Sequence, residues 1–401
     1  MAEGLRSEAA SRLADALDRL RGLRLGLDAE EVYRPEVPAA LVAAGLHTIC
    51  LPVDAGGLGA GLKETAIGQA ALGAIDGSAA LGFAMHQHVL GSAVESASWP
   101  AQLRQRLFAA VRDEGALLNS AATEEGGGSP ARGAIPATTA RIDRETVVLR
   151  GEKTWTTWLP ALRFALVTAT LEGDRAAPAD DEPVIGTFLV DLQLPGVFRR
   201  PSFDALGVRA SASGTLSLED VRVGLDDMIA RRWPGEPDPR GPAPGAWFGV
   251  CIAATYLGVG EGARDDVTRW ALGRRPGDGS ASVADLPTVQ VRLGKLDAAL
   301  RVARTVLLDV AGRWDAAPPG DRSALLADIG LAKITATNAA VTATDEALRI
   351  AGGPGYLAGR LERAFRDARA GLINPPLDDI AYQSYAKALI ERTEAQAREG
   401  H

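Results

Sequence analysis

Hydrophobic periodicity changes twice along this chain of 401 residues, and these changes constrain the fold more than any other feature. From residue 11 to about 113, apolar residues recur at helical spacing, beginning with Leu13, Leu17 and Leu20. From Leu117 to Val223, apolar and polar residues alternate between glycine and proline breaks, which is typical of β-strands. Helical spacing then returns. The sequence therefore predicts one sheet domain between two helical domains.

The predicted division is an N-terminal helical domain over 1–116, a middle β-domain over 117–230 and a C-terminal helical bundle over 231–401. The chain is longer than a single hydrophobic core usually serves, which favours several domains. Four helices joined by short loops are expected in the last domain, and they predict a four-helix bundle. They span Trp247–Leu272, Leu286–Trp314, Ser323–Gly352 and Asp379–Arg398.

Charge and cysteine content exclude several classes of function. The formal net charge is -8 and acids and bases are interspersed, so no nucleic-acid partner and no membrane partner are expected. Cys50 and Cys251 lie far apart in apolar contexts, which argues against a disulfide framework or a thiolate metal site and favours a cytoplasmic protein. No signal-peptide core follows Met1, and no apolar run is expected to span a bilayer.

The stretch Gly151–Thr157 combines aromatic, hydroxyl and charged residues between two apolar runs. Side chains alternate along a strand, so Trp155 and Thr157 are predicted to share one face. Such a pair could stack an indole near a flat heterocycle and aim a hydroxyl at its edge. An ordinary strand with a packed indole explains the same pattern, because aromatic and β-branched residues favour strands. The residues alone leave both interpretations open.

Four stretches resemble signature segments of the acyl-CoA dehydrogenases, in the same order and at similar separations. The family segments are Thr-Glu-Pro-Gly-x-Gly-Ser-Asp, Gly-x-Lys-x-Trp-Ile-Thr-Asn, Gly-x-Arg-x-Ser-x-Thr, and Gly-Gly-x-Gly-Tyr followed by Glu-Arg-x-x-Arg-Asp-Ala. The matching stretches here are Ala122–Ser129, Gly151–Thr157, Leu206–Ser213 and Gly352–Ala368. The resemblance covers nearly the whole chain. It implies a mainly α fold with an N-terminal helical domain, a middle β-barrel and a C-terminal four-helix bundle.

The resemblance implies a FAD-dependent flavoprotein whose isoalloxazine ring lies between the β-domain and the bundle. Thr123 and Thr157 would hydrogen-bond the ring and Trp155 would flank it, which would tune the electronics of the cofactor. Ser129 would lie near the diphosphate, where the backbone of Gly126–Gly128 could approach an anion closely. A plain glycine turn is the alternative interpretation of that loop.

Further cofactor contacts are implied near the far end of the bundle. The residues that match the family there are Arg274, Arg275, Gln290, Gly352, Gly353 and Gly355. By the resemblance, an arginine and the glutamine would contact the FAD of a neighbouring subunit, and the glycines would form the adenine-side loop. The same glycines could simply end a helix. A cofactor shared between subunits implies a homodimer or a homotetramer.

The chain departs from the family at the catalytic base. Members remove the α-proton of a thioester with a glutamate while hydride passes to the flavin, because a desolvated carboxylate can accept that proton. In many members this glutamate follows the Arg-Asp-Ala segment, and here Pro375 occupies its position. Other members place the base on the first helix of the bundle, where this chain has Phe248. Neither usual base is present.

Few side chains could replace the glutamate. His86 and His88 lie on a helix whose family counterpart lines the acyl pocket, so His86 is a candidate for both proton transfer and substrate contact. Positions i and i+2 point away from each other on a helix, so the pair does not predict a metal site. Asp378 and Asp379 follow the usual base position, although an aspartate at a helix start is commonly an N-cap.

The resemblance favours FAD-dependent α,β-dehydrogenation of acyl-CoA or another small-molecule thioester in fatty acid metabolism, with an electron-transfer flavoprotein or oxygen as acceptor. The missing glutamate leaves open a flavin-dependent monooxygenase or N-hydroxylase on the same fold, and a catalytically silent relative. Arg209 is a candidate contact for substrate phosphate groups, although an ordinary salt bridge explains it equally well. Glu125, next to Glu124, replaces the family proline beside the implied flavin, and it is interpreted as a solvated loop acid, with an unrecognised base as the alternative.

Overall fold

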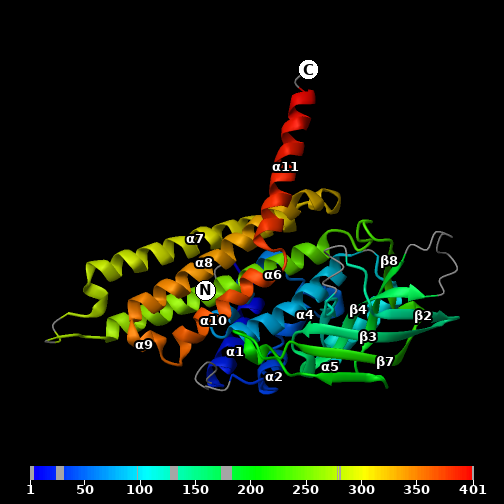
Figure 1. Cartoon of the computed structure of the whole chain (residues 1–401), viewed down its shortest axis with the longest axis horizontal. Coiled ribbons are helices and arrows are strands. Elements are labelled where there is room, and N and C mark those ends of the chain that lie inside the picture. Colours follow the sequence, from blue (N-terminus) through cyan, green and yellow to red (C-terminus); the bar gives the residue numbers. More distant parts are fainter. Residues whose placement is uncertain are drawn as a thin grey trace.

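Helices occupy both ends of the chain and one sheet occupies its middle (Figure 1), so the predicted fold class is confirmed. The computed structural model describes residues 4–23, 31–96, 98–126, 134–172, 183–277, 279 and 281–399. The first helical domain contains α1 Ser7–Gly22, α2 Glu36–Ala43, α3 Leu62–Gly73, α4 Gly77–Glu95 and α5 Ala101–Glu114.

The middle domain is a mixed sheet of eight described strands. Its order is β6-β7-β3-β2-β4-β5-β8, and β1 pairs with β4 in parallel. Most neighbours are antiparallel, whereas β2 and β4 are parallel. The strands are β1 Leu117–Ala121, β2 Thr139–Asp143, β3 Thr146–Thr156, β4 Leu162–Glu172, β5 Ile185–Asp191, β6 Val197–Arg200, β7 Gly214–Gly224 and β8 Met228–Arg232. The predicted limits of this domain, 117 and 230, fall beside the first and last strands.

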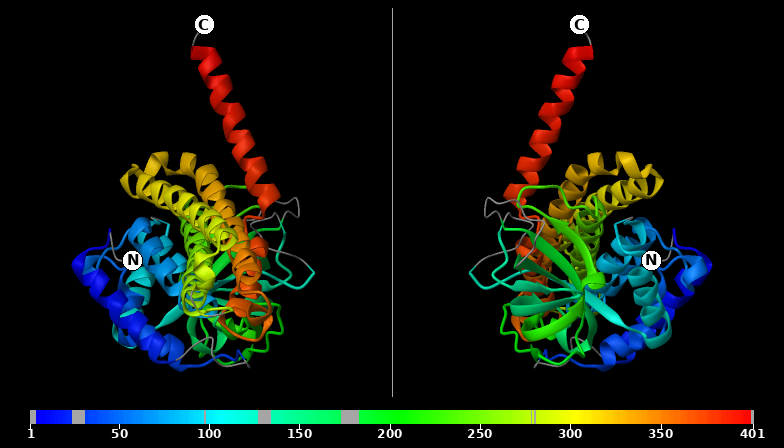
Figure 2. Two further views of the ribbon diagram at one scale, coloured as in Figure 1. Left: turned by 90° about the vertical axis from the view of Figure 1, so that its left-hand side faces the viewer. Right: turned by 90° about the vertical axis from the view of Figure 1, so that its right-hand side faces the viewer.

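The second helical domain corrects one sequence prediction. Its elements are α6 Ala243–Gly273, α7 Pro287–Ala316, α8 Leu326–Ala351, the short α9 Gly353–Tyr356, α10 Arg360–Ile373 and α11 Asp378–Glu399. The fourth bundle helix is α10, which packs against α6 and α8, whereas the predicted fourth helix, α11, touches α8 at its base and then projects from the body (Figures 1 and 2). Periodicity identifies a helix without revealing what it packs against.

Helix α6 is the centre of the helical half, where it packs against α3, α4, α7, α8 and α10. It is apolar on nearly all sides, as expected of a helix surrounded by others. Two segments, Ala243–Gly273 and Pro319–Ala351, are long and apolar enough to cross a membrane, contrary to the sequence prediction. In α6 the apolar window is 83% buried inside the protein, so packing within the fold accounts for its composition.

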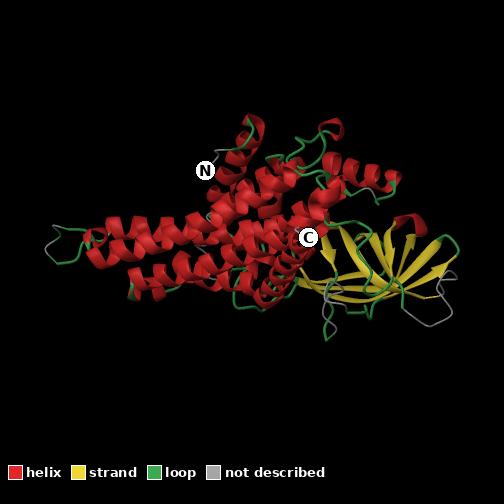
Figure 3. Ribbon diagram, turned by 90° about the horizontal axis from the view of Figure 1, so that it is seen from above, coloured by secondary structure: helices red, strands yellow, loops and turns green. Residues whose placement is uncertain are grey.

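Trp158 joins the sheet to the N-terminal domain. It follows β3, has a left-handed backbone with φ of 57°, and is almost completely buried against Gly82 of α4. A Cβ atom at Gly82 would lie 2.0 Å from the indole, closer than atoms can approach. Glycine at this position therefore allows the end of β3 to lie directly on α4 (Figure 3 shows the sheet against the helices).

Helix α10 joins the three parts of the fold through buried charges. Arg363 Nη2 lies 2.7 Å from Asp76 Oδ2, at the N-terminus of α4. Asp367 Oδ1 accepts the backbone N–H of Val208, in the loop before β7, at 2.5 Å. Burial is the main cause that raises the pKa of Asp367 to about 7, and the neighbouring Arg363 opposes that shift. One helix therefore fixes the N-terminal domain and the sheet relative to the bundle.

We expect Gly82→Ala to destabilise the protein by about 1–3 kcal/mol, because the added methyl group overpacks the Trp158 contact. The matched control is Gly68→Ala in α3, where the nearest atom to a new Cβ is 3.9 Å away. That control should be neutral or stabilising by up to about 1 kcal/mol, because alanine favours helix more than glycine does. Urea unfolding measures both. Equal stability of the two variants would contradict the tight contact.

Candidate active site

A β-bulge in strand β3 determines how Trp155 is presented. Lys153 pairs with Leu216 of β7 and Thr156 pairs with Gly214, so β3 contains one more residue than β7 between these positions. The extra residue is accommodated by Trp155, whose φ is 57°. Its side chain is 54% exposed and meets the ring of Phe203 edge-on at 5.5 Å. Thr157 is buried and lies one residue beyond the end of β3, so strand alternation does not decide whether it shares a face with Trp155.

Thr157 belongs to a row of three buried hydroxyl groups. Its Oγ1 lies 2.9 Å from Oγ of Ser213, which lies 2.8 Å from Oγ of Ser211. The backbone carbonyl of Thr157 accepts a hydrogen bond from Nδ2 of Asn119 in β1 at 3.1 Å. Both serines come from the Leu206–Ser213 stretch, so two of the singled-out sequence segments meet here. The sequence did not reveal that their hydroxyl groups are bonded.

A buried ion pair holds the segment around Thr123 against β3. Lys153 Nζ lies 2.5 Å from Glu124 Oε1, whose carboxylate also accepts the backbone N–H groups of Ala137 and Thr138. Burial favours a raised pKa for Glu124, but the hydrogen bond from Lys153 and those at Thr138 outweigh it and the pKa is lowered. Glu124 is therefore a buried, paired carboxylate, which the sequence did not reveal.

The same pair positions the predicted flavin loop. The carbonyl of Thr123 accepts the N–H of Thr154 at 2.8 Å, which ties the loop directly to the bulged strand. Glu125 is exposed, as expected of a loop acid. Ser129 lies outside the described residues, together with Gly127 and Gly128. The described part of the loop therefore reaches the strand of Trp155 and Thr157, and the predicted diphosphate contact stays a prediction.

The two histidines of α4 have different surroundings. His86 is fully buried and its Nε2 lies 2.8 Å from the carbonyl oxygen of His47. His88 lies one half-turn further and meets the ring of Phe248 edge-on, with centroids 5.2 Å apart. Burial lowers the pKa of His86 to about 3 and that of His88 to about 4, so both are neutral at pH 7. His88 therefore contacts the bundle at Phe248, the alternative position of the catalytic base.

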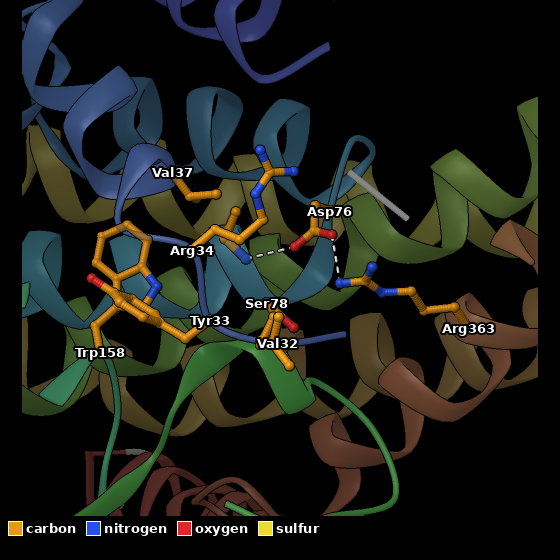
Figure 4. A pocket seen from close by; sticks show the side chains of 10 residues that line it. Val32, Tyr33, Arg34, Val37, Asp76, Ser78, Trp158 and Arg363 are labelled. Atoms are coloured by element: carbon orange, nitrogen blue, oxygen red, sulfur yellow. Dashed lines mark hydrogen bonds and ion pairs between the residues drawn. The ribbon is translucent and has the colours of Figure 1, made fainter. Parts of the chain in front are cut away.

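A separate pocket lies between α4, the segment before α2 and the end of β3 (Figure 4). At the edge of the pocket, the carboxylate of Asp76 accepts a hydrogen bond from the N–H of Ala79 and forms an ion pair with Arg363. The pocket has about 320 Å³ of space, including space open to solvent, and Trp158 contributes to its wall. Trp155 and Thr157 do not line it, so it is distinct from the surface around the bulge.

Comparison with known proteins decides the family. The profiles described as "Acyl-CoA dehydrogenase, middle domain" and "Acyl-CoA dehydrogenase, C-terminal domain" match residues 119–221 and 250–373. The protein named "Putative acyl-CoA dehydrogenase YdbM", from Bacillus subtilis (strain 168), is 34% identical to this chain over 352 residues. The match covers 87% of each chain. This chain belongs to the acyl-CoA dehydrogenase family.

Solved structures of the same fold include enzymes of different names. FMN-bound TdsC from Paenibacillus sp. A11-2 has a TM-score of 0.82 at 20% identity, covering 95% of this chain and 97% of that chain. Butyryl-CoA dehydrogenase from Megasphaera elsdenii has a TM-score of 0.79 at 19% identity, covering 97% of this chain and 100% of that chain. The predicted flavoprotein oxidoreductase class is confirmed by the family, whereas the reaction is not decided by these similarities.

The chemistry at the bulge fits a flavin. An acyl-CoA dehydrogenase needs a flat apolar surface and hydrogen-bonding groups at the ring edge. Here the exposed indole of Trp155 lies against Phe203, and Thr157 supplies a hydroxyl that is already fixed by Ser213. Trp155 is exposed, whereas Phe203 beside it is half-buried. Thr123, Trp155 and Thr157 would therefore hold the ring.

The remaining predicted cofactor residues lie at the other end of the molecule. Arg274 and Arg275 follow α6, and Gln290 lies in the first turn of α7, where its Nε2 donates to the carbonyl of Ala284. All three are exposed, as are Gly352 and Gly353, whereas Gly355 is buried. Figures 1 and 3 show these elements at the end of the bundle opposite the sheet. One chain does not bring the two sets together, and the predicted cross-subunit contact stays a prediction.

The usual base positions carry no proton acceptor in their side chains. Pro375 follows Asn374, whose Oδ1 accepts a hydrogen bond from the Tyr256 hydroxyl at 2.7 Å. Lys333 Nζ donates to the carbonyl of Pro376 at 2.9 Å, which fixes this loop to α8. Burial lowers the pKa of Lys333 to about 8. The loop of the usual glutamate is thus held firmly without a carboxylate.

The two aspartates predicted to replace the catalytic glutamate are either hydrogen-bonded within the protein or exposed to solvent. Asp378 begins α11, and its Oδ2 accepts a hydrogen bond from Nδ2 of Asn338 at 2.7 Å. Asp379 is exposed. Arg209, the predicted substrate contact, is exposed and lies 3.5 Å from Asp204. Among the described residues no group of three or more His, Cys, Asp or Glu side chains forms a metal site. The predicted roles of these residues stay predictions.

We expect the protein to lose stability as the pH falls from about 6.5 towards 4. His47, His86 and His88 are neutral when folded because burial lowers the pKa of each to about 4 or below, whereas unfolded histidine binds a proton below about 6.5. Three such groups contribute a slope of about 4 kcal/mol per pH unit in that window. Urea unfolding between pH 7 and 5 measures it. His47→Gln should reduce the slope by about 1.4 kcal/mol per pH unit, and an unchanged slope would contradict this origin.

Proposed function

We propose that this protein binds FAD at the Trp155 bulge and oxidises an acyl thioester by α,β-dehydrogenation. Its membership of the acyl-CoA dehydrogenase family and the likeness to the Megasphaera elsdenii butyryl-CoA dehydrogenase support this reaction. FAD rather than FMN is supported by the exposed arginines and glycines at the end of the bundle, which match the family's contacts with the adenosine part of the cofactor. When bound, the flavin supplies the two-electron oxidation, and the chain must supply a group for the α-proton.

The observation that carries this proposal is the contact of His88 with Phe248. Phe248 occupies the position of the base on the first bundle helix, and the imidazole of His88 lies against its ring. At neutral pH His88 is uncharged, because burial lowers its pKa to about 4, so it can accept a proton. We assign it as the proton acceptor that replaces the glutamate. His86 is the second candidate; its Nε2 lies 2.8 Å from the carbonyl oxygen of His47, and its ring meets that of Phe83.

A second candidate is a flavin-dependent monooxygenase or N-hydroxylase acting on a small molecule. The observation that favours it is the absence of a side-chain base at both usual positions, Pro375 and Phe248. TdsC, a structural neighbour, is described as a dibenzothiophene monooxygenase. In this case oxygen would be the electron acceptor, whereas an electron-transfer flavoprotein would accept electrons in the dehydrogenase.

Anaerobic titration of the FAD-loaded protein with a panel of acyl-CoA thioesters distinguishes the dehydrogenase from the monooxygenase. Bleaching of the flavin absorbance with formation of the enoyl thioester supports dehydrogenation. Failure of every thioester to bleach the flavin, together with rapid reoxidation of chemically reduced protein and hydroxylated product, supports the monooxygenase. A protein that takes up no flavin would contradict both and identify a silent relative.

We expect His88→Gln to slow flavin bleaching by an active thioester about 10²–10⁴-fold, because the amide cannot accept the α-proton. The matched control is His86→Gln, which alters a second buried histidine of the same helix and should keep nearly the wild-type rate. Stopped-flow absorbance measures the rate, and FAD binding by each variant verifies the fold. A larger loss in His86→Gln than in His88→Gln would reverse the assignment.

We infer that helix α11 joins two copies of this chain, as the predicted homodimer or homotetramer requires. Beyond its base the helix stands clear of the body (Figure 2), although helices in proteins gain most of their stability from tertiary packing. Tyr382, Tyr385 and Leu389 recur at spacings of three and four along one face, and Tyr382 and Leu389 are 57% and 52% exposed. A second copy would bury this stripe.

We expect wild-type protein to elute as a multiple of its 41.8 kDa chain mass and the double variant Tyr382→Glu, Leu389→Glu to form smaller species. Two buried carboxylates would oppose association strongly. The control is Lys387→Glu, which changes the net charge equally on another face of α11 and should leave the mass unchanged. Light scattering after gel filtration measures the mass. A monomeric wild type would contradict the inference.

A further inference from the structure

The row of hydroxyl groups that ends at Thr157 starts in the loop before β7. Ser211, Ser213 and Thr157 are all buried. The hydroxyl oxygen of Ser213 lies 2.8 Å from that of Ser211 and 2.9 Å from that of Thr157. Each hydroxyl has a single proton and two lone pairs. Each gap between two neighbours therefore holds one proton, and only one of the two oxygens donates into it. When Ser213 donates into the gap to Thr157, the Thr157 proton is left for another acceptor.

The loop that carries the serines is fixed at several backbone positions. The carbonyl of Ser211 accepts the N–H of Trp158 at 2.8 Å, which binds the loop to the residue after Thr157. Val208 donates its N–H to Asp367 of α10 at 2.5 Å. A Cβ at Gly207 would lie 2.4 Å from the carbonyl oxygen of Arg366, so the loop lies directly on the helix backbone. The hydroxyl row is thus held by the bundle as well as by the sheet.

We propose that Ser213, supported by Ser211, is a positioning residue that directs the proton of Thr157 towards the flavin ring. This inference rests on the proposed FAD site at Trp155 and Thr157. If Ser211 donates to Ser213 and Ser213 donates to Thr157, then Thr157 retains its own proton for an acceptor on the ring edge. A donor there stabilises the electron-rich reduced ring, so the row raises the reduction potential of the bound cofactor.

The consequence is a function for two serines that touch no substrate. Without Ser213, the Thr157 hydroxyl would be free to turn and donate elsewhere, and its bond to the ring would lose its fixed direction. Cofactor binding would change little, because the ring is held by several other groups. The reduction potential would fall, because the lost bond is stronger to the reduced state than to the oxidised one.

The test is a double-mutant cycle on the FAD-loaded protein, with the reduction potential measured by dye equilibration, which needs no substrate. Ser213→Ala should bind FAD like wild type and shift the two-electron reduction equilibrium about tenfold towards the oxidised form, which is a fall of about 30 mV. Ser213→Thr keeps a hydroxyl and should restore the wild-type potential. In a Thr157→Val background, Ser213→Ala should have no further effect.

The control is Ser217→Ala, which removes another buried hydroxyl of β7 that bonds Glu152 and Arg200 instead. It should leave the potential unchanged. An unaltered potential in Ser213→Ala, or an equal shift with and without the Thr157 hydroxyl, would overturn the role of the row while leaving the FAD site intact. Failure of the wild type to bind FAD would overturn the site itself and the row with it.

Discussion

The structure depends on buried charges carried by α10. Arg363 reaches Asp76 of the N-terminal domain, and Asp367 accepts the backbone of Val208 in the sheet domain. On the same helix, Arg366 pairs with Glu31 and donates to the carbonyl of Leu206 at 3.0 Å. Burying these charges is costly unless each has a partner, and removing a single partner commonly costs about 3–5 kcal/mol. Charges of this kind stabilise one arrangement of the three parts rather than adding general cohesion.

The position of the candidate site follows from that arrangement. The loop held by Asp367 carries Ser211 and Ser213, which contact Thr157. The indole of Trp158, one residue further along, lies against Gly82 of α4. The end of β3 is therefore determined by the bundle through the loop and by the N-terminal domain through one aromatic ring. An error in the orientation of either helical domain would displace the groups predicted to hold the flavin.

The sequence predicts the arrangement of domains well because it is encoded in local periodicity and in short segments. The two changes of period locate the sheet within a few residues, and the four family-like stretches identify the flavin fold. Local patterns fail where a tertiary contact decides the outcome. Strand alternation assumes a regular strand through Thr157, but β3 has a bulge before Thr156 and ends there. Helical spacing identifies α11 but not its projection from the body.

The two histidines of α4 also show that sequence patterns cannot assign a chemical role that depends on tertiary contacts. His86 and His88 lie two residues apart in one apolar helix, and neither charge nor spacing ranks them. Both have backbone hydrogen bonds within the N-terminal domain, and they differ in the ring that each meets, which is Phe83 of α4 for His86 and Phe248 of α6 for His88. Glu124 is a similar case, since a loop acid next to a buried lysine cannot be recognised until the strand that carries Lys153 is placed.

Replacing a glutamate with a buried histidine changes the electrostatics of proton transfer. A carboxylate that accepts a proton loses its charge, whereas a neutral imidazole becomes a cation in a site whose burial disfavours cations. The same burial that lowers the pKa of His88 to about 4 makes its protonated form a strong acid, which returns the proton readily at neutral pH. A site built around His88 would therefore remove a proton less easily than one built around glutamate and release it more easily.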